Sequence, residues 1–454
     1  MRDGAPKTIG LLDHMGYGNL GDAAIQEAVI TNIKKRLPNA QLVGFSLIPD
    51  DTMKRHGIPC YPLRWWYRKH EQAGNQAGAR MVFKLRLKSA LKRQPLFYAW
   101  AKAVADFARE AQFWVRSYRT LRSLDLLIIS GGGQLDDLWH GPWSHPYTLF
   151  KFSLLAKLAR KKLYFLNVGA GRLEHPLSRF FARWAIRFAD YRSFRDHDSQ
   201  EFIRSLGVKA ETYVYPDPAY ALKVEDYLKS TPCGSLMPVV GLNPTGFCDP
   251  RFWPRKKNDS IYQDYLEKIT RFAAWLLEQG YNLRVFTTET TTDRYVIEDL
   301  KARLRAQLSS PELVSQVFRG ASQSVRDVLR EMSEFDFVVT SKFHAIIFSH
   351  LLRKPVISLS YHRKMDFAMR AVGQGHFCAD IERFDVDWLI KAFRLLVTES
   401  ASIKSAYAAA VEARAARLSQ QFDSLFCRTG QQSLRPPARL PLARQTRLMD
   451  NWHS

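Results

Sequence analysis

The sequence predicts an α/β protein built from two doubly wound, Rossmann-like domains that face a cleft. Three observations lead to this prediction. Short apolar runs alternate with segments of helical spacing, glycine directly follows several of these runs, and one stretch, 229–237, carries Ser, Thr, Pro and Gly without periodicity. The length of 454 residues agrees, because it exceeds one ordinary core and suits two domains of about 200 residues each.

The first half of the chain contains four runs that we interpret as strands. The first precedes a glycine loop and a helical segment at 23–37, and the third precedes a helical segment at 178–188. Strands that feed helices in this way pair in parallel, so we expect an N-terminal α/β domain over 1–228. The four runs are 7–12, 124–130, 162–168 and 191–196.

The second half repeats this pattern after the aperiodic stretch 229–237, which we interpret as a linker. The segment 265–277 has helical spacing between the first two strand-like runs, so we expect a C-terminal α/β domain over 238–384. Residues 385–427 have helical spacing throughout, and 428–454 are basic with few apolar residues, which predicts a disordered tail. The four runs are 239–243, 282–287, 335–340 and 355–360.

The composition restricts the partners. The formal net charge of +23 favours polyanions, which include nucleic acid, an acidic membrane leaflet and phosphorylated substrates. The five cysteines form no CxxC pair, no run of about 20 apolar residues is present, and the first residues contain no apolar leader segment. We therefore expect a cytoplasmic protein with no metal site and no cofactor.

The loop Gly16-Tyr-Gly18-Asn-Leu-Gly21 matches G-x-G-x-x-G between a strand and a helix, the context of a dinucleotide-binding loop. Two features oppose NAD or FAD: Asp22 stands where the helix would hold a pyrophosphate, and the next acidic residues come nearly 30 positions later. A tight turn with Asp22 capping the helix is the structural alternative. A third alternative is a functional loop in which Asn19 and Asp22 bind sugar hydroxyls.

Five short motifs resemble landmarks of the polysaccharide pyruvyl transferase family, and together they span 7 to about 375. They are Gly18-Asn-Leu-Gly-Asp22, Gly131-Gly-Gly133, Phe194-Arg-Asp196, Asp217-Pro-Ala219 and Ser341-Lys-Phe-His-Ala345. The resemblance implies a fold like the two-domain GT-B glycosyltransferases. It also implies an enzyme that transfers the pyruvyl group of phosphoenolpyruvate to a hydroxyl, or a pair of hydroxyls, of a cell-surface or extracellular polysaccharide precursor, giving a pyruvate ketal and phosphate.

The motif Ser341-Lys-Phe-His344 suits this chemistry. A strand ends before it, Ser341 is a candidate N-cap, and Lys342 and His344 fall in the first helical turn, where free N–H groups and the helix dipole favour an anion. The reaction needs an acid that protonates the methylene carbon of the donor. The resemblance implies that His344 is this acid. A first-turn histidine bonded to a backbone carbonyl is the structural alternative.

The resemblance also implies where the substrates bind, with the acceptor on the first domain and the donor on the second. Lys342 stands where the family commonly has arginine, and it neutralises an oxyanion without gripping it in a bidentate way. Arg195 matches the other donor-binding arginine; an ordinary pair with Asp196 or Asp198 is its alternative. We expect the donor to bind Arg195, Ser341, Lys342, Asn243 and Lys364, and the acceptor to bind Asn19, Asp22 and Gly132.

A basic, aromatic segment at about 64–122 interrupts the first domain. It carries fourteen Lys/Arg and three Asp/Glu with aromatic residues between them. Such a helical insertion is typical of contact with anionic membrane surfaces, where a lipid-linked acceptor would be met on the cytosolic face. Solvated helices whose aromatics pack on the domain are the alternative, and we expect no nucleic acid, since no recognition motif is present.

Two other functions remain open at the level of sequence. The first is a nucleotide-sugar-dependent glycosyltransferase that uses the same two-domain cleft. The second is a non-catalytic protein that binds glycans or membranes, which the joint presence of Arg195 and His344 disfavours.

Overall fold

The structure is a computed structural model. It describes residues 7–13, 18–65, 95–137, 141–171, 173–228, 237–254, 256–307, 311–318, 320 and 322–427. The predicted linker lies outside the described residues except for Met237, and so do the predicted tail and residues 66–94 of the basic segment.

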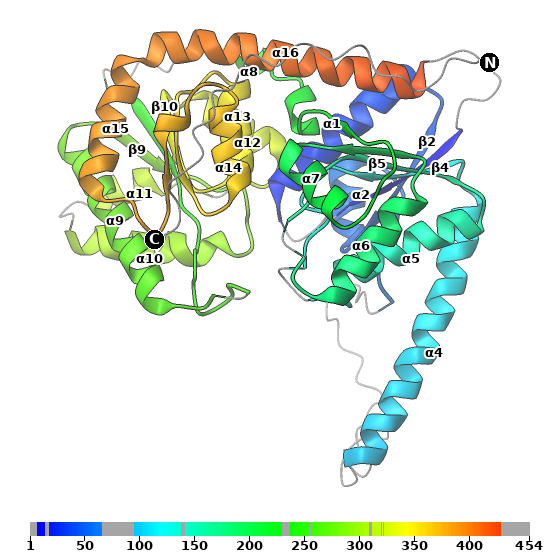
Figure 1. The fold of residues 1–454 in the computed structure, drawn as a ribbon. Coiled ribbons are helices and arrows are strands. Elements are labelled where there is room, and N and C mark those ends of the chain that lie inside the picture. Colours follow the sequence, from blue (N-terminus) through cyan, green and yellow to red (C-terminus); the bar gives the residue numbers. More distant parts are fainter. Residues whose placement is uncertain are drawn as a thin grey trace.

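The first domain is a seven-stranded parallel sheet with helices on both faces (Figure 1). Its strand order is β3-β2-β1-β4-β5-β6-β7, so the chain starts in the middle and winds to both edges. The strands are β1 (Thr8–Leu12), β2 (Gln41–Ser46), β3 (Cys60–Pro62), β4 (Leu126–Ser130), β5 (Lys162–Val168), β6 (Tyr191–Phe194) and β7 (Tyr213–Val214). The helices are α1 (Leu20–Arg36), α2 (Pro49–His56), α4 (Pro95–Arg122), α5 (His145–Leu158), α6 (Pro176–Phe188), α7 (His197–Ser205), η1 (Pro218–Ala221) and α8 (Glu225–Leu228).

The second domain is a five-stranded parallel sheet of order β12-β11-β10-β8-β9. The strands are β8 (Val239–Asn243), β9 (Asn282–Val285), β10 (Phe337–Thr340), β11 (Val356–Ser360) and β12 (Cys378–Asp380). The helices are α9 (Asp259–Glu278), α10 (Asp293–Gln307), α11 (Pro311–Val317), α12 (Val325–Ser333), α13 (Phe343–Leu351), α14 (Arg363–Arg370), η2 (Gly375–Phe377), α15 (Val386–Thr398) and α16 (Ser400–Phe426).

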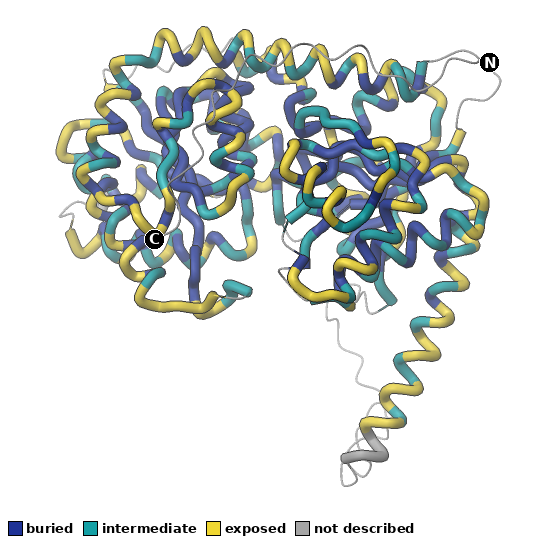
Figure 2. Tube along the Cα trace, in the orientation of Figure 1, coloured by how far each residue is buried: buried dark blue, intermediate teal, exposed yellow. Residues whose placement is uncertain are grey.

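All eight predicted strands are present: seven of them pair with a neighbour on both sides, and the eighth, β9, is an edge strand long enough to leave an apolar run in the sequence. Every residue of β4, β8, β10 and β11 is buried (Figure 2). The prediction missed β2, β3, β7 and β12. Three of these are edge strands of two or three residues, too short to leave a pattern in the sequence.

The predicted helical stretch 385–427 is two helices that connect the domains. The break between α15 and α16 falls at Glu399. Helix α16 then runs across both domains (Figure 1), and at its far end the buried Gln421 donates to the Asn167 side chain at 2.7 Å and to Tyr191 Oη at 2.9 Å. A second connection joins Tyr220 Oη and His350 Nδ1, 2.8 Å apart.

Candidate active site

The carboxyl ends of the strands of both sheets lie at one interface. There the loop Thr288–Thr290 of the second domain forms hydrogen bonds with the start of α1. The Leu20 N–H donates to the Thr288 carbonyl at 2.9 Å, and the Thr290 N–H donates to the Gly18 carbonyl at 3.1 Å. Asn19 and Glu289 form an antiparallel bridge between these hydrogen bonds. The described part of the glycine loop, Gly18–Gly21, is therefore held directly against the second domain.

Asn19, and not Asp22, is the N-cap of α1. Its Oδ1 accepts from the Gly21 and Asp22 N–H groups at 3.0 and 3.3 Å, so the alternative in which Asp22 caps the helix is not what the structure shows. Asn19 Nδ2 donates to Asp22 Oδ2 at 2.8 Å, which orients this carboxylate. A Cβ placed on Gly132 would lie 3.4 Å from Asp22 Oδ1, so Gly132 faces the other side of the same group.

His344 projects from the first turn of α13 onto the start of α1. A Cβ placed on Gly21 would lie 1.9 Å from His344 Nδ1, so the ring rests directly on the Gly21 backbone. The predicted cap of this helix was wrong: Lys342 occupies the N-cap position, and the Ser341 hydroxyl lies 3.0 Å from Tyr265 Oη instead. His344 Nε2 is buried and makes no hydrogen bond to the described residues. The carbonyl-bonded histidine considered as an alternative is thus not seen at this nitrogen.

Arg195 lies across from His344, at the end of β6. Its side chain is only 7% exposed and packs on the Gly169 backbone, where a Cβ would lie 2.4 Å from its Cζ. Its ion pairs are long, 3.5 Å to Asp196 and 3.6 Å to Asp217, against about 2.8 Å for a well-formed charge-assisted hydrogen bond. A buried guanidinium held this loosely retains donors for an anionic ligand.

Phe343 brings a second cation to the same place. The Arg195 Cζ lies 4.9 Å from the Phe343 ring centroid, and the Lys364 Nζ lies 5.4 Å from it. Lys364 comes from the first turn of α14. Burial and Arg195 lower the pKa of Lys364 to about 8, against the opposing pull of nearby carboxylates. At neutral pH two cations from different domains therefore share one aromatic ring.

The same cations lower the pKa of His344 well below its ordinary value, after burial, which is the largest cause. The unliganded site therefore holds a neutral imidazole at pH 7. A bound anion would offset Lys364 and Arg195 and restore proton affinity to the ring.

Three carboxylates face these cations. Burial raises the pKa of Asp22 to about 6, with Asp217 and Asp136 adding to the rise while Lys364 and Arg195 oppose it. Burial also raises the pKa of Asp217, whose Oδ1 accepts from the Ala219 N–H at 3.0 Å. The site therefore combines buried and half-buried groups of both charges, which suits a ligand that carries both acids and hydroxyls.

Lys342 points away from this cluster. Its Nζ lies 2.6 Å from Asp293 Oδ1; the side chains are 16% and 1% exposed. Burial raises the pKa of Asp293 to about 6, against the effect of Lys342, while Asp293 raises that of Lys342 in spite of burial. In this arrangement Lys342 neutralises a buried carboxylate.

Asn243 also has protein partners. It is fully buried, its Nδ2 donates to the Phe286 carbonyl at 2.9 Å, and its Oδ1 accepts from Thr340 Oγ1 at 2.9 Å. It therefore ties β8 to the chain after β9 and to β10. Two of the predicted site residues, Asn243 and Lys342, thus have their side chains directed into the interior of the second domain. The structure brings six others together at the interface: Asn19, Asp22, Gly132, Arg195, His344 and Lys364.

Reasoning from sequence did not assign roles to Asp136, Asp217 and Phe343. Asp217 stood in a recognised motif, and Phe343 stood beside His344, but nothing local indicates that Phe343 supports two cations from different domains. Asp136 follows the Gly131–Gly133 strand end, and a Cβ on Gly171 would lie 2.9 Å from its Cβ. Proximity to a glycine strand end was the one signal that could have indicated it.

The described residues include no helix long and apolar enough to cross a membrane. A search of curated proteins finds no match. The chain matches the family model described as Polysaccharide pyruvyl transferase over residues 19–363.

Solved structures similar to this chain share its fold at low identity. One is the UDP-GlcNAc 2-epimerase of Methanocaldococcus jannaschii, with a TM-score of 0.52 and 9% identity over 86% of this chain and 92% of that chain. Another is a glycosyltransferase of Rickettsia africae ESF-5, with a TM-score of 0.51 and 10% identity over 92% of this chain and 97% of that chain. A third is the UDP-GlcNAc 2-epimerase of Neisseria meningitidis bound to UDP-GlcNAc, with a TM-score of 0.50 and 11% identity over 90% of this chain and 99% of that chain. These likenesses confirm the predicted two-domain GT-B-like architecture.

Proposed function

The chain belongs to the polysaccharide pyruvyl transferase family, and we propose that it transfers the pyruvyl group of phosphoenolpyruvate to a sugar hydroxyl, or a pair of hydroxyls, of a cell-surface or extracellular polysaccharide precursor. The observation that carries the proposal is that Arg195 and Lys364 both lie within about 5.5 Å of the Phe343 ring centroid, beside His344, whose buried Nε2 makes no hydrogen bond to the described residues.

This arrangement supports phosphoenolpyruvate as the donor. The molecule carries a carboxylate and a phosphate, and two cations, the buried Arg195 guanidinium and the half-buried Lys364 ammonium, match two anionic groups. Arg195 can hold one of them in a bidentate way, and Lys364 supplies a point charge for the other. Asp22 and Asp217 are acceptors for the hydroxyl groups of a sugar placed on the opposite side.

The chemistry follows from these positions. As the sugar oxygen bonds to C2 of the donor, the C2=C3 double bond takes a proton at C3 from His344, and the hydroxyl proton passes to a base. The phosphate then leaves C2 with the electrons of its C–O bond. Attack on C2 by a second hydroxyl, with loss of its proton, then closes the pyruvate ketal.

Phosphate release tests the proposal. The protein should release phosphate from phosphoenolpyruvate when a lipid-linked oligosaccharide is added as a candidate acceptor. Arg195→Gln should raise the KM for phosphoenolpyruvate about tenfold or more, as expected for one charge-assisted contact, and leave the KM for the acceptor unchanged. Binding of nucleotide sugars in place of phosphoenolpyruvate, followed by ultraviolet difference spectra, would favour a glycosyltransferase and refute the donor proposed here.

We also propose that the protein contacts the cytosolic face of an anionic membrane through α4. This helix projects from the first domain (Figure 1), and its outer half exposes one apolar stripe, with Trp100 64% and Phe107 76% exposed and Val104 between them. Apolar side chains along one face of a basic helix are typical of membrane-surface helices. A lipid-linked acceptor would then lie within reach of the cleft.

A further inference from the structure

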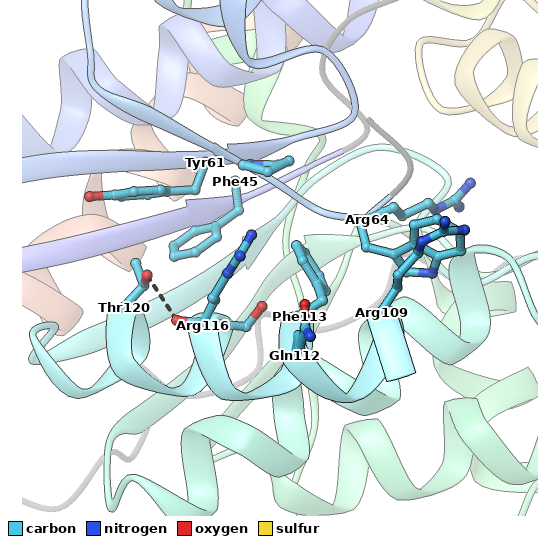
Figure 3. A pocket seen from close by; sticks show the side chains of 11 residues that line it. Phe45, Tyr61, Arg64, Arg109, Gln112, Phe113, Arg116 and Thr120 are labelled. Carbon is cyan, nitrogen blue, oxygen red and sulfur yellow. Dashed lines mark hydrogen bonds between the residues drawn. The ribbon is translucent and has the colours of Figure 1, made fainter. Parts of the chain in front are cut away.

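A cavity of about 630 Å³ lies outside the catalytic cleft, at the inner end of α4. Helix α4 forms one wall, and the ends of β2 and β3 with the chain after them form the other (Figure 3). Phe113 and Arg116 point from the helix toward Phe45 and Tyr61 on the strands (Figure 3). Nothing in the proposed reaction uses this cavity.

All charged side chains that line the cavity, among the described residues, are positive. Arg64, Arg109 and Arg116 line it, and among the described lining residues none is acidic. Arg109 forms an exposed ion pair with Asp106 at 3.0 Å, which lies outside the cavity, and Arg64 Nη2 donates to Ser144 Oγ at 2.9 Å. The Arg116 guanidinium makes no hydrogen bond or ion pair to the described residues, so at least one cation is available to a ligand.

Four aromatic residues also line the cavity, with Pro62, Gln112, Ser117 and Thr120 between them. Phe45 and Tyr61 lie with ring centroids 5.9 Å apart, Phe113 is buried beside them, and Arg109 lies over Trp65 with its Cζ 5.5 Å from the ring. Arginine prefers phosphate groups, which it grips through several donors, and aromatic faces bury apolar or sugar surface. The lining therefore fits a ligand that joins a phosphate group to an apolar chain.

We propose that this cavity binds the phosphate or diphosphate head of a lipid carrier, as a second site for the acceptor. The inference rests on the proposed function for the identity of that acceptor. Arg109 and Arg116 are seven residues apart, hence on one face of α4 and about 10 Å apart along its axis. A lipid carrier whose chain enters the membrane beside the outer half of α4 would pass the arginines on its way to the cleft.

The test is a binding measurement that needs no turnover. Isothermal titration with geranyl diphosphate, at saturating phosphoenolpyruvate to occupy the catalytic anion site, should show one site. Arg116→Gln and Arg109→Gln should each weaken binding about tenfold, as expected for loss of a charged hydrogen bond. Arg119→Gln is the matched control: it removes the same charge from the same helix, at an exposed position outside the cavity, and should leave binding unchanged.

Two further arms identify the source of the phosphate. Inorganic pyrophosphate should bind at least tenfold more weakly than geranyl diphosphate, because it leaves the aromatic walls empty; equal binding would overturn the lipid carrier. No binding of geranyl diphosphate, or equal loss in Arg119→Gln, would overturn the site. Because Arg116→Gln should retain full turnover on a short soluble acceptor, failure of this inference is distinguishable from failure of the proposed function.

Discussion

The His344 ring rests on the backbone of Gly21, so that the proposed acid of the second domain and the helix start of the first are in direct contact. A Cβ at Gly21 would lie 1.9 Å from Nδ1 and 2.3 Å from Cγ of the ring. No side chain can be added at Gly21 unless the imidazole or the whole domain moves.

Gly21→Ala should therefore lower kcat at least about tenfold, because a displacement of about 1 Å in a catalytic group is costly. Circular dichroism should show an intact fold. Gly320→Ala is the control, since a Cβ there meets nothing within 4 Å, and it should turn over as wild type. Wild-type turnover in Gly21→Ala would show that the contact has no part in catalysis.

His344→Gln should abolish transfer by about 100-fold or more, the usual contribution of a general acid, while phosphoenolpyruvate still binds. Burial, with Lys364 and Arg195, lowers the pKa of His344 and keeps it neutral in the free site. Because an anionic donor would offset the two cations, its binding should bring a proton to the ring. Titrations in buffers of different ionisation enthalpy should detect proton uptake in wild type and less of it in the variant. Equal uptake would place the proton elsewhere.

Lys342→Ala should destabilise the protein by about 2–4 kcal/mol, because it leaves the buried Asp293 carboxylate without its cation. Adding Asp293→Asn should recover part of this loss, and Lys342→Arg should largely avoid it. Urea unfolding measures both effects. If Lys342 also contacts the donor, as its motif predicts, the double variant will be folded but will show a raised KM for phosphoenolpyruvate.

Asp22→Asn should stabilise the protein more at pH 7.5 than at pH 4.5. The folded-state pKa of about 6 exceeds the ordinary value of 3.8, so ionisation of Asp22 opposes folding, and the penalty grows as the pH rises from 3.8 to 6. Asparagine removes this penalty, which the rise from 3.8 to about 6 places at about 3 kcal/mol well above pH 6. The difference between variant and wild type in urea unfolding, measured across pH, isolates Asp22. A constant difference would contradict the raised pKa.

Wild-type protein should bind vesicles more strongly as their phosphatidylglycerol content rises and more weakly as salt rises, since each basic group near the surface contributes about 1 kcal/mol. Trp100→Ser with Phe107→Ser should remove the part of the binding that salt does not affect. Replacing the following five basic residues, which lie outside the described residues, with glutamine should remove the part that salt does affect: Lys84, Arg86, Lys88, Lys92 and Arg93. Neither change should alter turnover on a short soluble acceptor. Co-sedimentation that is equal for all variants would leave α4 as ordinary surface.

The sequence by itself determined the two parallel sheets, because buried central strands such as β4 and β8 must be apolar along their whole length. It also indicated the strand ends at which the motifs lie, because parallel strands present their carboxyl ends at one edge. Short edge strands such as β3 left no such mark. The same holds for the caps: a residue suited to capping, such as Asp22 or Ser341, has no local feature that shows whether a neighbour will cap instead.

Only the tertiary structure decided which motif residues meet. Arg195 and Lys342 look equivalent in the sequence, yet Arg195 lies over the Phe343 ring near His344 while Lys342 forms an ion pair with Asp293. No feature of the sequence near Lys342 indicates that it will pair with Asp293, which lies 49 positions earlier. The contact between Gly21 and His344 likewise depends on the backbone hydrogen bonds that hold the start of α1 against the loop Thr288–Thr290. Such pairings join residues that are remote in the chain, within the second domain for Lys342 and Asp293 and between the domains for Gly21 and His344. They arise from tertiary packing and leave no periodic trace in the sequence.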